Sequence, residues 1–583
     1  MAAPQAEPRR PTSMSGAGEA RPRQSSSSYV VGNAPQYTAT RRHSLYGTED
    51  RIIIDPGSRF WKVGFSGEGK PRQVFLVGSR HVGHAHDEAG GGVSQLWQLE
   101  GPKTAEEREE ADRMLAARLQ DALRSVFFES LMTDPKSRKV IIVEHPLLPL
   151  RVKDLLAKIL FDNLNIPSLS FASSSLLALI AVGRTSGLVV DSGHLETYAL
   201  PISSSRPMYP LIKTTPRAGA RLTQHLRALI LEFGTFHPPF ATLAGSANTA
   251  PRPTRIPPEI LTDAIIEDIK TSCCFVGRVM SQSPSGAPDT MGIDTDMPSP
   301  RTEDRMSVDP ESQPHTPLRS GPNSGTQTPV RQSQAGSSAS WATRYQRDSS
   351  AVDFLVPVKP PPPLSGTGRG SIRVPGWVRE RAAELLFEAG DVDEASVAEV
   401  VLQSLLKTPV DLRKDLISTI VVIGGTAMMP GFIPRLHDEI VRTLTKVTPT
   451  ASVRSPKRRA YDPYEPLRAL VDHVAILNNP SPVPSRARTA GSAPAFAPLC
   501  MSWVGGSIAG ALKTGGQEIL HDKWDEASVV IEEPETPLHG LATRENNFVL
   551  PDWTRAPLRV GAPHAGVHPP RQYGVPLDEP ITV

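Results

Sequence analysis

Short apolar runs recur along the chain and predict buried β-strands at residues 51–54, 140–144, 188–191 and 419–423. The last three runs are almost continuously apolar, which is typical of strands that are covered on both faces. Long stretches in which polar and apolar residues mix separate the runs from one another. The pattern therefore predicts strands in the interior of a sheet, with other elements between them.

Between these runs the apolar residues follow the period of an amphipathic helix. Helices are predicted at residues 105–131, 151–164, 221–233, 259–275 and 380–389. In the second of them, Leu155, Leu156, Ile159 and Leu160 have a spacing that places them on one helix face. The alternation of buried strands with such helices predicts an α/β fold.

Two long segments lack either pattern. Residues 1–50 are rich in Ser, Pro, Arg and Ala, and residues 281–375 contain repeated Ser-Pro and Thr-Pro steps. Such segments bury too little apolar surface to offset the entropy lost on ordering. The first is predicted to be a disordered N-terminal arm, and the second a Pro/Ser-rich disordered insert.

Smaller interruptions lie further along the chain. Loop inserts are predicted at about residues 447–467 and 480–498, and a Pro-rich C-terminal tail at residues 536–583. What remains is a core in two parts, residues 51–280 and 376–535. A core of that length is sufficient to bury a large apolar interior.

The charge balance and cysteine content exclude several classes of protein. The 583 residues include 63 basic and 61 acidic side chains, which gives a net charge of +2 and no overall attraction to nucleic acid or membranes. Three cysteines are too few for a disulfide framework. No apolar stretch matches a signal peptide or the length of a membrane span. We therefore expect an intracellular protein with no nucleic-acid partner and no direct membrane contact.

Two glycine turns are the strongest candidates for chemistry. In each, an apolar run ends in an aspartate, Asp55 or Asp191, and continues into a turn of Gly and Ser residues. Backbone N–H groups in such turns can converge on a phosphate, and the aspartate can hold a metal ion through water. One turn of this kind is more often an ordinary hairpin. Two copies indicate a duplicated nucleotide clamp.

Several segments around these turns resemble actin and the actin-related proteins. The first turn continues into Lys62-Val-Gly-Phe-Ser-Gly67, and the second lies within Gly183-Arg-Thr-Ser-Gly187-Leu-Val-Val-Asp191-Ser-Gly193. In their order along the chain, the matching segments are 55–67, 183–193, 218–223, 267–270, 410–431 and 503–508. The chain is therefore identified as a member of the actin superfamily. That resemblance implies two related α/β lobes around a nucleotide cleft, interrupted by disordered inserts.

The resemblance also implies a set of nucleotide-binding residues, with ATP or ADP and Mg²⁺ as the cofactor. Asp55 and Asp191 lie where the family holds its divalent cation through water, and Lys62 where it reaches a phosphate. Others lie where the family contacts phosphates or nucleoside: Gly57, Ser58, Ser192, Gly193, Lys270, Gly424, Gly425, Thr426 and Met428.

Other positions depart from the family pattern. Pro56 removes a backbone N–H from the first turn, and Arg59 brings a large cation beside the expected phosphates, where it could compensate or block. In the second turn His194 replaces the family aspartate, and Leu195 replaces a glycine. The family's water-orienting glutamine falls on Ser174, whose side chain is short. Because phosphoryl transfer depends on positioning, we expect ATP hydrolysis to be absent or vestigial, and no catalytic residue is assigned.

The segment that the family uses for polymerisation is replaced. Residues 78–112 contain Gly78-Ser-Arg-His, three successive glycines and an acidic Glu106-Glu-Arg-Glu-Glu110 helix start in place of the family's mobile loop and its following motif. A head-to-tail filament needs complementary surfaces at both ends of each subunit. The sequence therefore predicts a protein that is not a homopolymer.

Within the superfamily, the chain is most similar to the fungal-type actin-related subunit of the dynactin pointed end. That resemblance implies a capping role in dynein-driven microtubule transport, with a filament-forming actin-related protein and dynactin pointed-end subunits as partners. It also implies a cytoplasmic, cytoskeletal location. A nuclear actin-related scaffold of a chromatin-remodelling complex is the alternative, favoured by the basic residues 457–459. A second alternative is an active actin-type ATPase.

Overall fold

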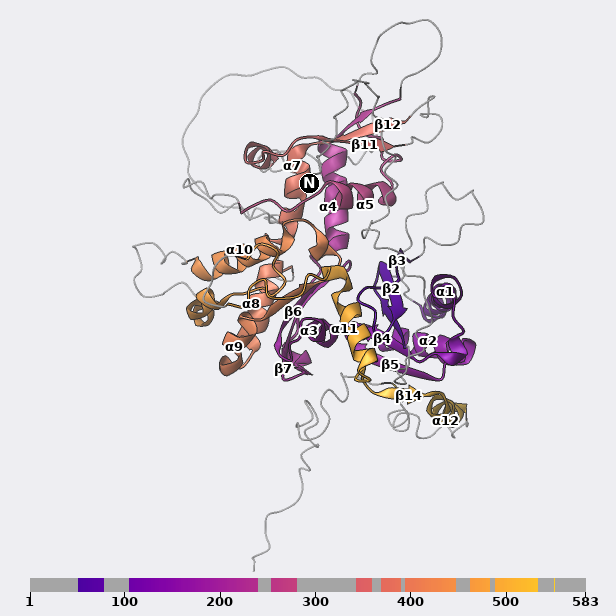
Figure 1. The fold of residues 1–583 in the computed structure, drawn as a ribbon. Coiled ribbons are helices and arrows are strands. Elements are labelled where there is room, and N and C mark those ends of the chain that lie inside the picture. Colours follow the sequence, from indigo (N-terminus) through magenta and orange to yellow (C-terminus); the bar gives the residue numbers. More distant parts are fainter. Residues whose placement is uncertain are drawn as a thin grey trace, which may run out of the picture. The chain divides into compact units, whose positions relative to one another are not determined.

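Three β-sheets, with helices between and around them, make up the fold in the computed structural model of the chain (Figure 1). The structure describes these residues: 51–77, 104–239, 253–279, 342–358, 369–388, 394–446, 462–482, 488–532 and 550. All of them belong to one compact unit, Thr48–Val583.

The first sheet has six strands in the order β14-β5-β4-β1-β2-β3. β1 runs parallel to β4, which is parallel to β5, while β1 and β2 form an antiparallel hairpin. The strands are β1 (Ile52–Pro56), β2 (Phe60–Phe65), β3 (Gln73–Leu76), β4 (Val140–Glu144), β5 (Ser168–Ser173) and β14 (Glu518–Leu520).

The second sheet repeats this local plan. β6 and β7 form an antiparallel hairpin, and β13 lies parallel to β6 on its other side. The strands are β6 (Gly187–Ser192), β7 (Thr197–Ser203), β8 (Arg206–Pro207), β9 (Lys213–Thr215) and β13 (Ile420–Ile423). In both sheets, therefore, a hairpin strand that ends near an aspartate has a parallel neighbour.

Alternate residues of each sheet face different cores, as the period of a β-strand requires. In β1, Ile52 and Ile54 pack into an outer core, whereas Ile53 packs into a central one. In β6, Val189 reaches that same central core while Leu188 faces the opposite side. The apolar runs are continuous because both faces of these strands are buried.

Two helices, α3 (Ser174–Ala181) and α11 (Met501–Ala511), lie between the two sheets and fill the central core (Figure 1). Their close approach depends on Gly505, because a Cβ at that position would lie 1.8 Å from the Leu177 carbonyl oxygen. The indole Nε1 of Trp503 donates to the Ile53 carbonyl at 3.1 Å, which ties α11 to the first sheet. The helix therefore joins the two halves of the fold.

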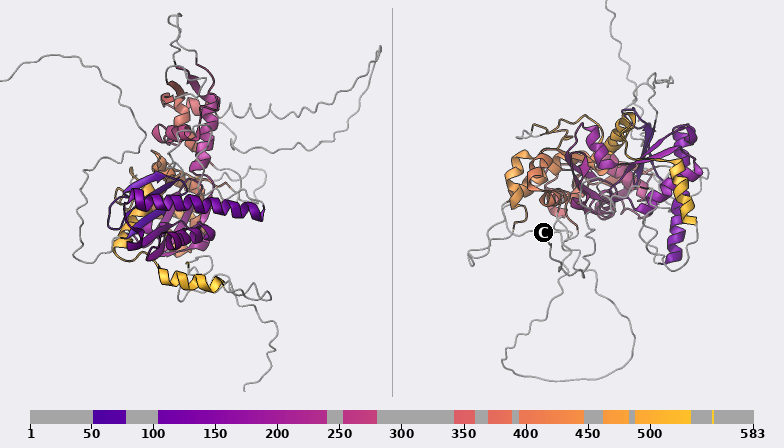
Figure 2. Two further views of the ribbon diagram at one scale, coloured as in Figure 1. Left: turned by 90° about the vertical axis from the view of Figure 1, so that its right-hand side faces the viewer. Right: turned by 90° about the horizontal axis from the view of Figure 1, so that it is seen from below.

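Further helices cover the outer faces of the sheets. On the first sheet these are α1 (Ala105–Ser125), α2 (Leu150–Lys158) and the π-helical turns Val126–Ser130 and Ile159–Asn163. Figure 2 shows the full length of α1, and it also shows α12 (His521–Glu532), the helix that follows β14. Helices that pack into the other outer core are α4 (Gly219–Phe233), α5 (Asp263–Ser272), α7 (Gly376–Arg381), α8 (Val397–Lys407), α9 (Val410–Ile417) and α10 (Phe432–Thr445).

The predicted elements differ from the observed ones mainly at their ends. The helix predicted at 259–275 begins only at Asp263, because Thr262 caps it by accepting from the Ile265 backbone N–H at 3.4 Å. The helix predicted at 380–389 begins earlier, at Gly376, and continues as a 3₁₀ helix over Ala382–Leu386. The predicted strand positions agree with β1, β4, β6 and β13 to within a few residues.

The boundary of the large predicted insert needs correction. Part of residues 281–375 forms β11 (Phe354–Val358) and β12 (Gly370–Val374), which join β10 (Thr235–His237) in the third sheet. Val356 and Ile372 are paired across these strands and are buried in the same core as α4 and α5. The described residues of the second part therefore begin at residue 342. These short strands lie beside a proline-rich run, and the β10 strand that completes their sheet is more than 100 residues earlier in the sequence, so they were missed.

Other predicted interruptions fall partly outside the described residues. The arm at 1–50, residues 280–341 and nearly all of the tail at 536–583 lie outside them. Within the predicted loop at 480–498, however, Ala493 and Phe496 pack against the central core. Among the described helices, none is both long enough and apolar enough to cross a membrane.

Candidate functional site

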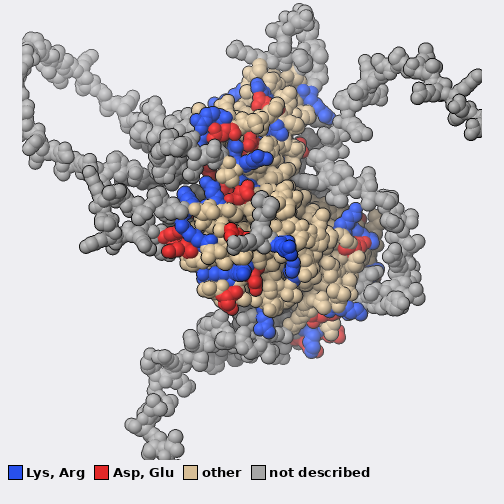
Figure 3. Space-filling view, turned by 60° about the vertical axis from the view of Figure 1, so that its left-hand side comes forward, with Lys and Arg blue, Asp and Glu red and all other residues tan. Residues whose placement is uncertain are grey.

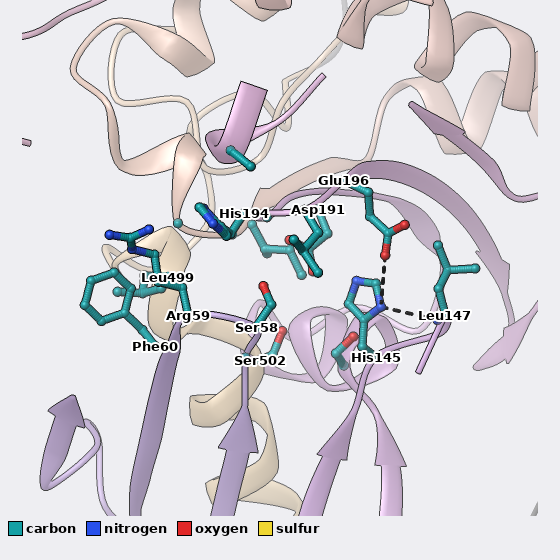
Figure 4. Close-up of a pocket in the computed structure, with 18 of the residues that line it drawn as sticks. Ser58, Arg59, Phe60, His145, Leu147, Asp191, His194, Glu196, Leu499 and Ser502 are labelled. Atoms are coloured by element: carbon teal, nitrogen blue, oxygen red, sulfur yellow. Dashed lines mark hydrogen bonds and ion pairs between the residues drawn. The ribbon is translucent and has the colours of Figure 1, made fainter. Parts of the chain in front are cut away.

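A cavity of about 790 Å³ lies between the two aspartate hairpins (Figure 4). Its wall is made by the β1–β2 turn, the residues after β4, the β6–β7 turn, the start of α4 and the Ile423–Gly425 segment. Pockets of roughly 300–1,000 Å³ are typical of small-molecule and cofactor sites. The cavity therefore has room for a nucleotide-sized ligand.

The first hairpin places a buried ion pair at the cavity. Asp55 and Lys62 are register partners on β1 and β2, and Lys62 Nζ lies 2.7 Å from Asp55 Oδ2. Gly57 makes the tight turn, because a Cβ there would lie 2.5 Å from the Phe60 carbonyl oxygen. Lys62 thus brings to the cavity a cation whose charge Asp55 already balances.

The second hairpin has the same geometry with a different partner. Asp191 on β6 is the register partner of Tyr198 on β7, so a tyrosine stands where the first hairpin has its lysine. Burial raises the pKa of Asp191 to about 6; Lys62 opposes this rise and Asp55 adds to it. The two hairpins therefore share one cation between two carboxylates.

The second turn is fixed by contacts from distant segments. Gly193 accepts hydrogen bonds from Thr426 Oγ1 at 2.6 Å and from the Gly219 backbone N–H at 3.1 Å. Gly424 has a φ of +100°, and a Cβ there would lie 2.5 Å from Asp191 Oδ1. Only glycine suits that backbone and that close approach. The turn's position therefore depends on residues more than 200 positions later in the sequence.

The structure brings most of the predicted site residues to the cavity wall, but not all. On the wall are Asp55, Gly57, Ser58, Lys62, Asp191, Gly193, Gly424 and Gly425. Four others are not among the lining residues: Ser192, Lys270, Thr426 and Met428. Ser192 is buried with its Oγ 3.0 Å from Thr197 Oγ1, and Met428 is 39% exposed. Ser192 and Thr426 thus stabilise the second turn by hydrogen bonds without lining the cavity.

Two lining residues were not assigned a role from the sequence. His145 follows β4, and Glu196 lies in the second turn; His145 Nδ1 and Glu196 Oε1 are 3.8 Å apart (Figure 4). Burial raises the pKa of Glu196 to about 7, and the charge of Asp191 adds to the rise. Burial, with Lys62 nearby, lowers the pKa of His145 to about 4. Next to the end of β4, the cavity wall therefore holds a neutral imidazole beside a weakly acidic carboxyl.

The sequence contains one signal for His145. It comes directly after a parallel strand that neighbours β1, and ligand sites in α/β sheets gather at the carboxyl ends of such strands. Its ring packs edge-on against Tyr198, with centroids 4.9 Å apart. Glu196 has no comparable signal, because its position depends on the shape of the turn.

Ser174, at the start of α3, stands where the resemblance places a glutamine. Its Oγ lies 3.2 Å from the Tyr198 hydroxyl, and the neighbouring Ser175 Oγ lies 2.9 Å from the same oxygen. Ser174 lines the cavity but is only 6% exposed. Its short side chain therefore engages the tyrosine and does not extend into the cavity.

Elsewhere on the cavity wall, His194 replaces an expected carboxylate. Burial, together with the nearby cations Arg59 and Lys270, lowers the pKa of His194 to about 4. A neutral imidazole at this position supplies no negative charge to a metal ion. Among the described residues, no three His, Cys, Asp or Glu side chains are grouped as direct metal ligands.

Taken together, the phosphate side of the cavity fits a nucleotide. Gly57 and Gly193 shape two turns of backbone, Lys62 supplies a cation, and Asp55 and Asp191 supply two carboxylates for a hydrated metal ion. The nucleoside side fits less well. There, Lys270 is bonded to Glu267 and Thr223 and does not reach the cavity.

Comparison with known proteins agrees with this geometry. The sequence profile described as Actin matches residues 47–464, more than two thirds of the chain. Human actin-like protein 7B is 28% identical over 261 residues, covering 42% of this chain and 56% of that protein. The protein of the same name from Macaca fascicularis is 26% identical over 259 residues, with the same two shares. The chain thus spans little more than half the length of these two relatives.

A fungal relative matches over a longer stretch. An actin-like protein of Neurospora crassa is 24% identical over 408 residues, which cover 68% of this chain and 84% of that protein. The α/β fold predicted from the sequence, with its paired lobes and cleft, is confirmed. The family profile extends across both aspartate hairpins and most of the residues that line the cavity between them. This chain belongs to the actin family.

Proposed function

We propose that this protein is a non-polymerising actin-related protein that caps the pointed end of a short actin-related filament in the dynactin complex. In that role it would support dynein-driven transport along microtubules from a cytoplasmic, cytoskeletal location. Its partners would be the last subunit of a filament-forming actin-related protein and the pointed-end subunits of dynactin.

The main support for the proposal is that the chain keeps the family fold but has different residues at two positions in the wall of the cleft. Ser174 faces Tyr198 at 3.2 Å, and His194 is a neutral imidazole where a carboxylate is expected. Filament turnover in a polymerising subunit depends on hydrolysis, whereas a subunit that only ends a filament does not need it. Loss of the hydrolysis groups with retention of the fold therefore favours a stationary capping role.

Domains of the actin family generally bind nucleotide, and we propose that ATP or ADP with Mg²⁺ serves here as a structural ligand. Lys62 would contact the phosphates, and Asp55 and Asp191 would hold Mg²⁺ through water. Any ligand that binds only the folded state stabilises it by mass action. A bound nucleotide would in this way hold the two hairpins together without being turned over.

The hydrolysis part of the proposal can be tested by itself. Single-turnover assays with MgATP should show no burst of phosphate release above the uncatalysed rate. The double variant Ser174→Gln with His194→Asp restores two missing groups, and a gain of turnover would identify them as the missing elements. No gain would implicate Pro56 and Arg59 as well. A wild-type rate like that of actin would contradict the proposal and favour an active ATPase.

The face drawn in Figure 3 has mixed charge: acidic and basic side chains of the described residues lie beside one another there, with no large patch of one sign. The basic residues 457–459, which favoured a nuclear scaffold, lie outside the described residues. Residues 78–103 of the replaced segment 78–112 lie outside them as well, so the proposal that this protein does not self-polymerise rests on the sequence of that segment.

The capping role predicts a specific set of partners. Affinity purification of the tagged full chain from its native cells at moderate salt, followed by mass spectrometry, should recover a filament-forming actin-related protein with dynactin subunits. The purified chain should also sediment as a monomer under conditions in which actin polymerises. Recovery of remodelling ATPases with nuclear actin would overturn the capping role in favour of the chromatin-remodelling scaffold.

A further inference from the structure

Arg59 forms an ion pair across the cleft. It lies in the β1–β2 turn, and its Nη1 is 3.6 Å from Oε1 of Glu267 on α5. Both side chains are only 13% exposed. The strand that follows Arg59 packs into the first outer core through Trp61, whereas α5 packs into the other outer core through Ile266. The pair therefore connects two parts of the fold that do not share a core.

Glu267 is the centre of this contact. Its Oε1 also accepts from Lys270 Nζ at 2.7 Å and from Thr223 Oγ1 at 2.5 Å. Burial alone would raise the pKa of Glu267, but the attraction of Lys270 and Arg59 outweighs burial and lowers it. The carboxylate is therefore ionised and shared between two cations. We call Arg59, Glu267 and Lys270 the cleft latch.

The latch lies at the edge of the cavity. Arg59 and His194 are both among the cavity-lining residues, whereas Glu267 and Lys270 are not (Figure 4). The Arg59 side chain thus stands between the cavity and the helix that the sequence resemblance assigned to the nucleoside. Its Nε is buried and has no hydrogen-bond partner within the described part of the chain. Among the described residues, Glu267 is the acidic side chain that pairs with this guanidinium.

From the sequence, Arg59 could either compensate for lost phosphate contacts or block the site. The geometry points to a third role: we propose that Arg59 closes the cleft of the nucleotide-free protein through Glu267, and that a nucleoside phosphate binds only by displacing this contact. The latch replaces part of the bridging that a bound nucleotide would otherwise provide. This inference goes beyond the capping role and does not depend on it.

The expected size of the effect follows from the other partners of Glu267. Because the carboxylate keeps Lys270 and Thr223 when Arg59 is removed, loss of the wider 3.6 Å contact costs about 1 kcal/mol, which corresponds to roughly a fivefold change in an equilibrium constant. Removing Arg59 should therefore tighten nucleotide binding about fivefold. If Arg59 were a phosphate ligand, its removal would weaken binding by a comparable or larger factor. A closing role for Arg59 therefore predicts tighter nucleotide binding in Arg59→Ala, and a phosphate-binding role predicts weaker binding.

The test uses the full-length chain and three variants. Arg59→Ala removes the latch, Glu267→Gln releases both cations, and Arg72→Ala is the matched control. Arg72 pairs with Glu68 at 2.7 Å at a more exposed position, 44% for Arg72 itself. Isothermal titration with MgADP and MgATP should show tighter binding for the first two variants and no change for the control. Weaker, equal or undetectable binding to Arg59→Ala would overturn the competition between Arg59 and nucleotide.

A second measurement requires no nucleotide. Hydrogen exchange of the α5 amides (Asp263–Ser272) in the nucleotide-free protein should be faster in Arg59→Ala and Glu267→Gln than in wild type or Arg72→Ala. The charge-exchanged double variant Arg59→Glu with Glu267→Arg should restore slow exchange of the α5 amides, because the two side chains can pair again. In that variant the new arginine at position 267 lies beside Lys270, which has the same charge. Unchanged α5 exchange in Arg59→Ala would overturn the closing role even if nucleotide affinity rose.

Discussion

Glu384 and Arg435 form a two-point ion pair in the interior of the second half of the fold. Arg435 Nη1 lies 2.9 Å from Glu384 Oε1, and Arg435 Nη2 lies 2.7 Å from Glu384 Oε2. Arg381 Nη1 reaches the same carboxylate at 3.0 Å, and the Glu384 side chain is 2% exposed. This buried carboxylate joins α10 to the segment that follows α7.

Removing Glu384 should strongly destabilise the fold. In Glu384→Ala, two arginines are left buried without their shared carboxylate, and breaking such a pair costs about 3–5 kcal/mol. Chemical denaturation, followed by circular dichroism, would measure the loss in unfolding free energy. Arg442→Ala is the control, because Arg442 is 43% exposed at the edge of the same network. A loss below 1 kcal/mol for Glu384→Ala would show that water reaches these groups.

The Asp55–Lys62 pair predicts a second loss of stability, at the cavity itself. The two side chains are 12% and 8% exposed, so Lys62→Met leaves a largely buried carboxylate without its cation. We expect a loss of about 3–5 kcal/mol in unfolding free energy. The double variant Asp55→Asn with Lys62→Met should recover much of it, which a double-mutant cycle would measure. A loss in the double variant equal to the sum of the losses in Lys62→Met and Asp55→Asn alone would mean that the pair does not interact.

Because α11 packs closely on α3, adding a single methyl group at Gly505 should lower the stability of the fold. Gly505→Ala places a Cβ 1.8 Å from the Leu177 carbonyl oxygen, so one helix must move away from the other. Overpacking of this kind costs about 1–3 kcal/mol or more, seen as a lower melting temperature. Gly69→Ala is the matched control, since nothing lies within 4 Å of a Cβ there. Identical melting of the two variants would contradict the observed packing.

Glu196 predicts a pH-dependent difference in stability. The folded protein raises the pKa of this carboxyl to about 7 from its ordinary 4.5, so the folded state binds the proton more tightly than the unfolded state. The stabilisation that this proton provides is present below pH 4.5 and is lost as the pH rises through 7.

Glu196→Gln should therefore be more stable than wild type at pH 8, and the difference should shrink as the pH falls to 4.5. Thermal melts of the nucleotide-free protein across that range would show it. Glu109→Gln, at an exposed position on α1, is the control and should show no such trend. A constant difference between Glu196→Gln and wild type at every pH would contradict the raised pKa.

Much of the fold could be read from the sequence, because its signals are local. Continuous apolar runs identified β4, β6 and β13, and the repeated aspartate–glycine turn identified the hairpins that flank the cavity. Residues such as Asp55 and Asp191 could be placed at the site because each lies near the end of its strand, next to the turn. These features depend only on near neighbours along the chain.

The tertiary structure decided what depends on residues that are distant in sequence. Strands β11 and β12 are stable only as partners of one another and of β10, so their proline-rich surroundings concealed them. Glu196 meets His145 only because the β6–β7 turn comes close to the residues that follow β4. Likewise, the sequence placed Arg59 beside the expected phosphates, and only the fold brought Glu267 within 3.6 Å of it. The sequence by itself determined strands β1, β4, β6 and β13 and the two aspartate turns. The packing of the two halves determined which charges face one another across the cleft.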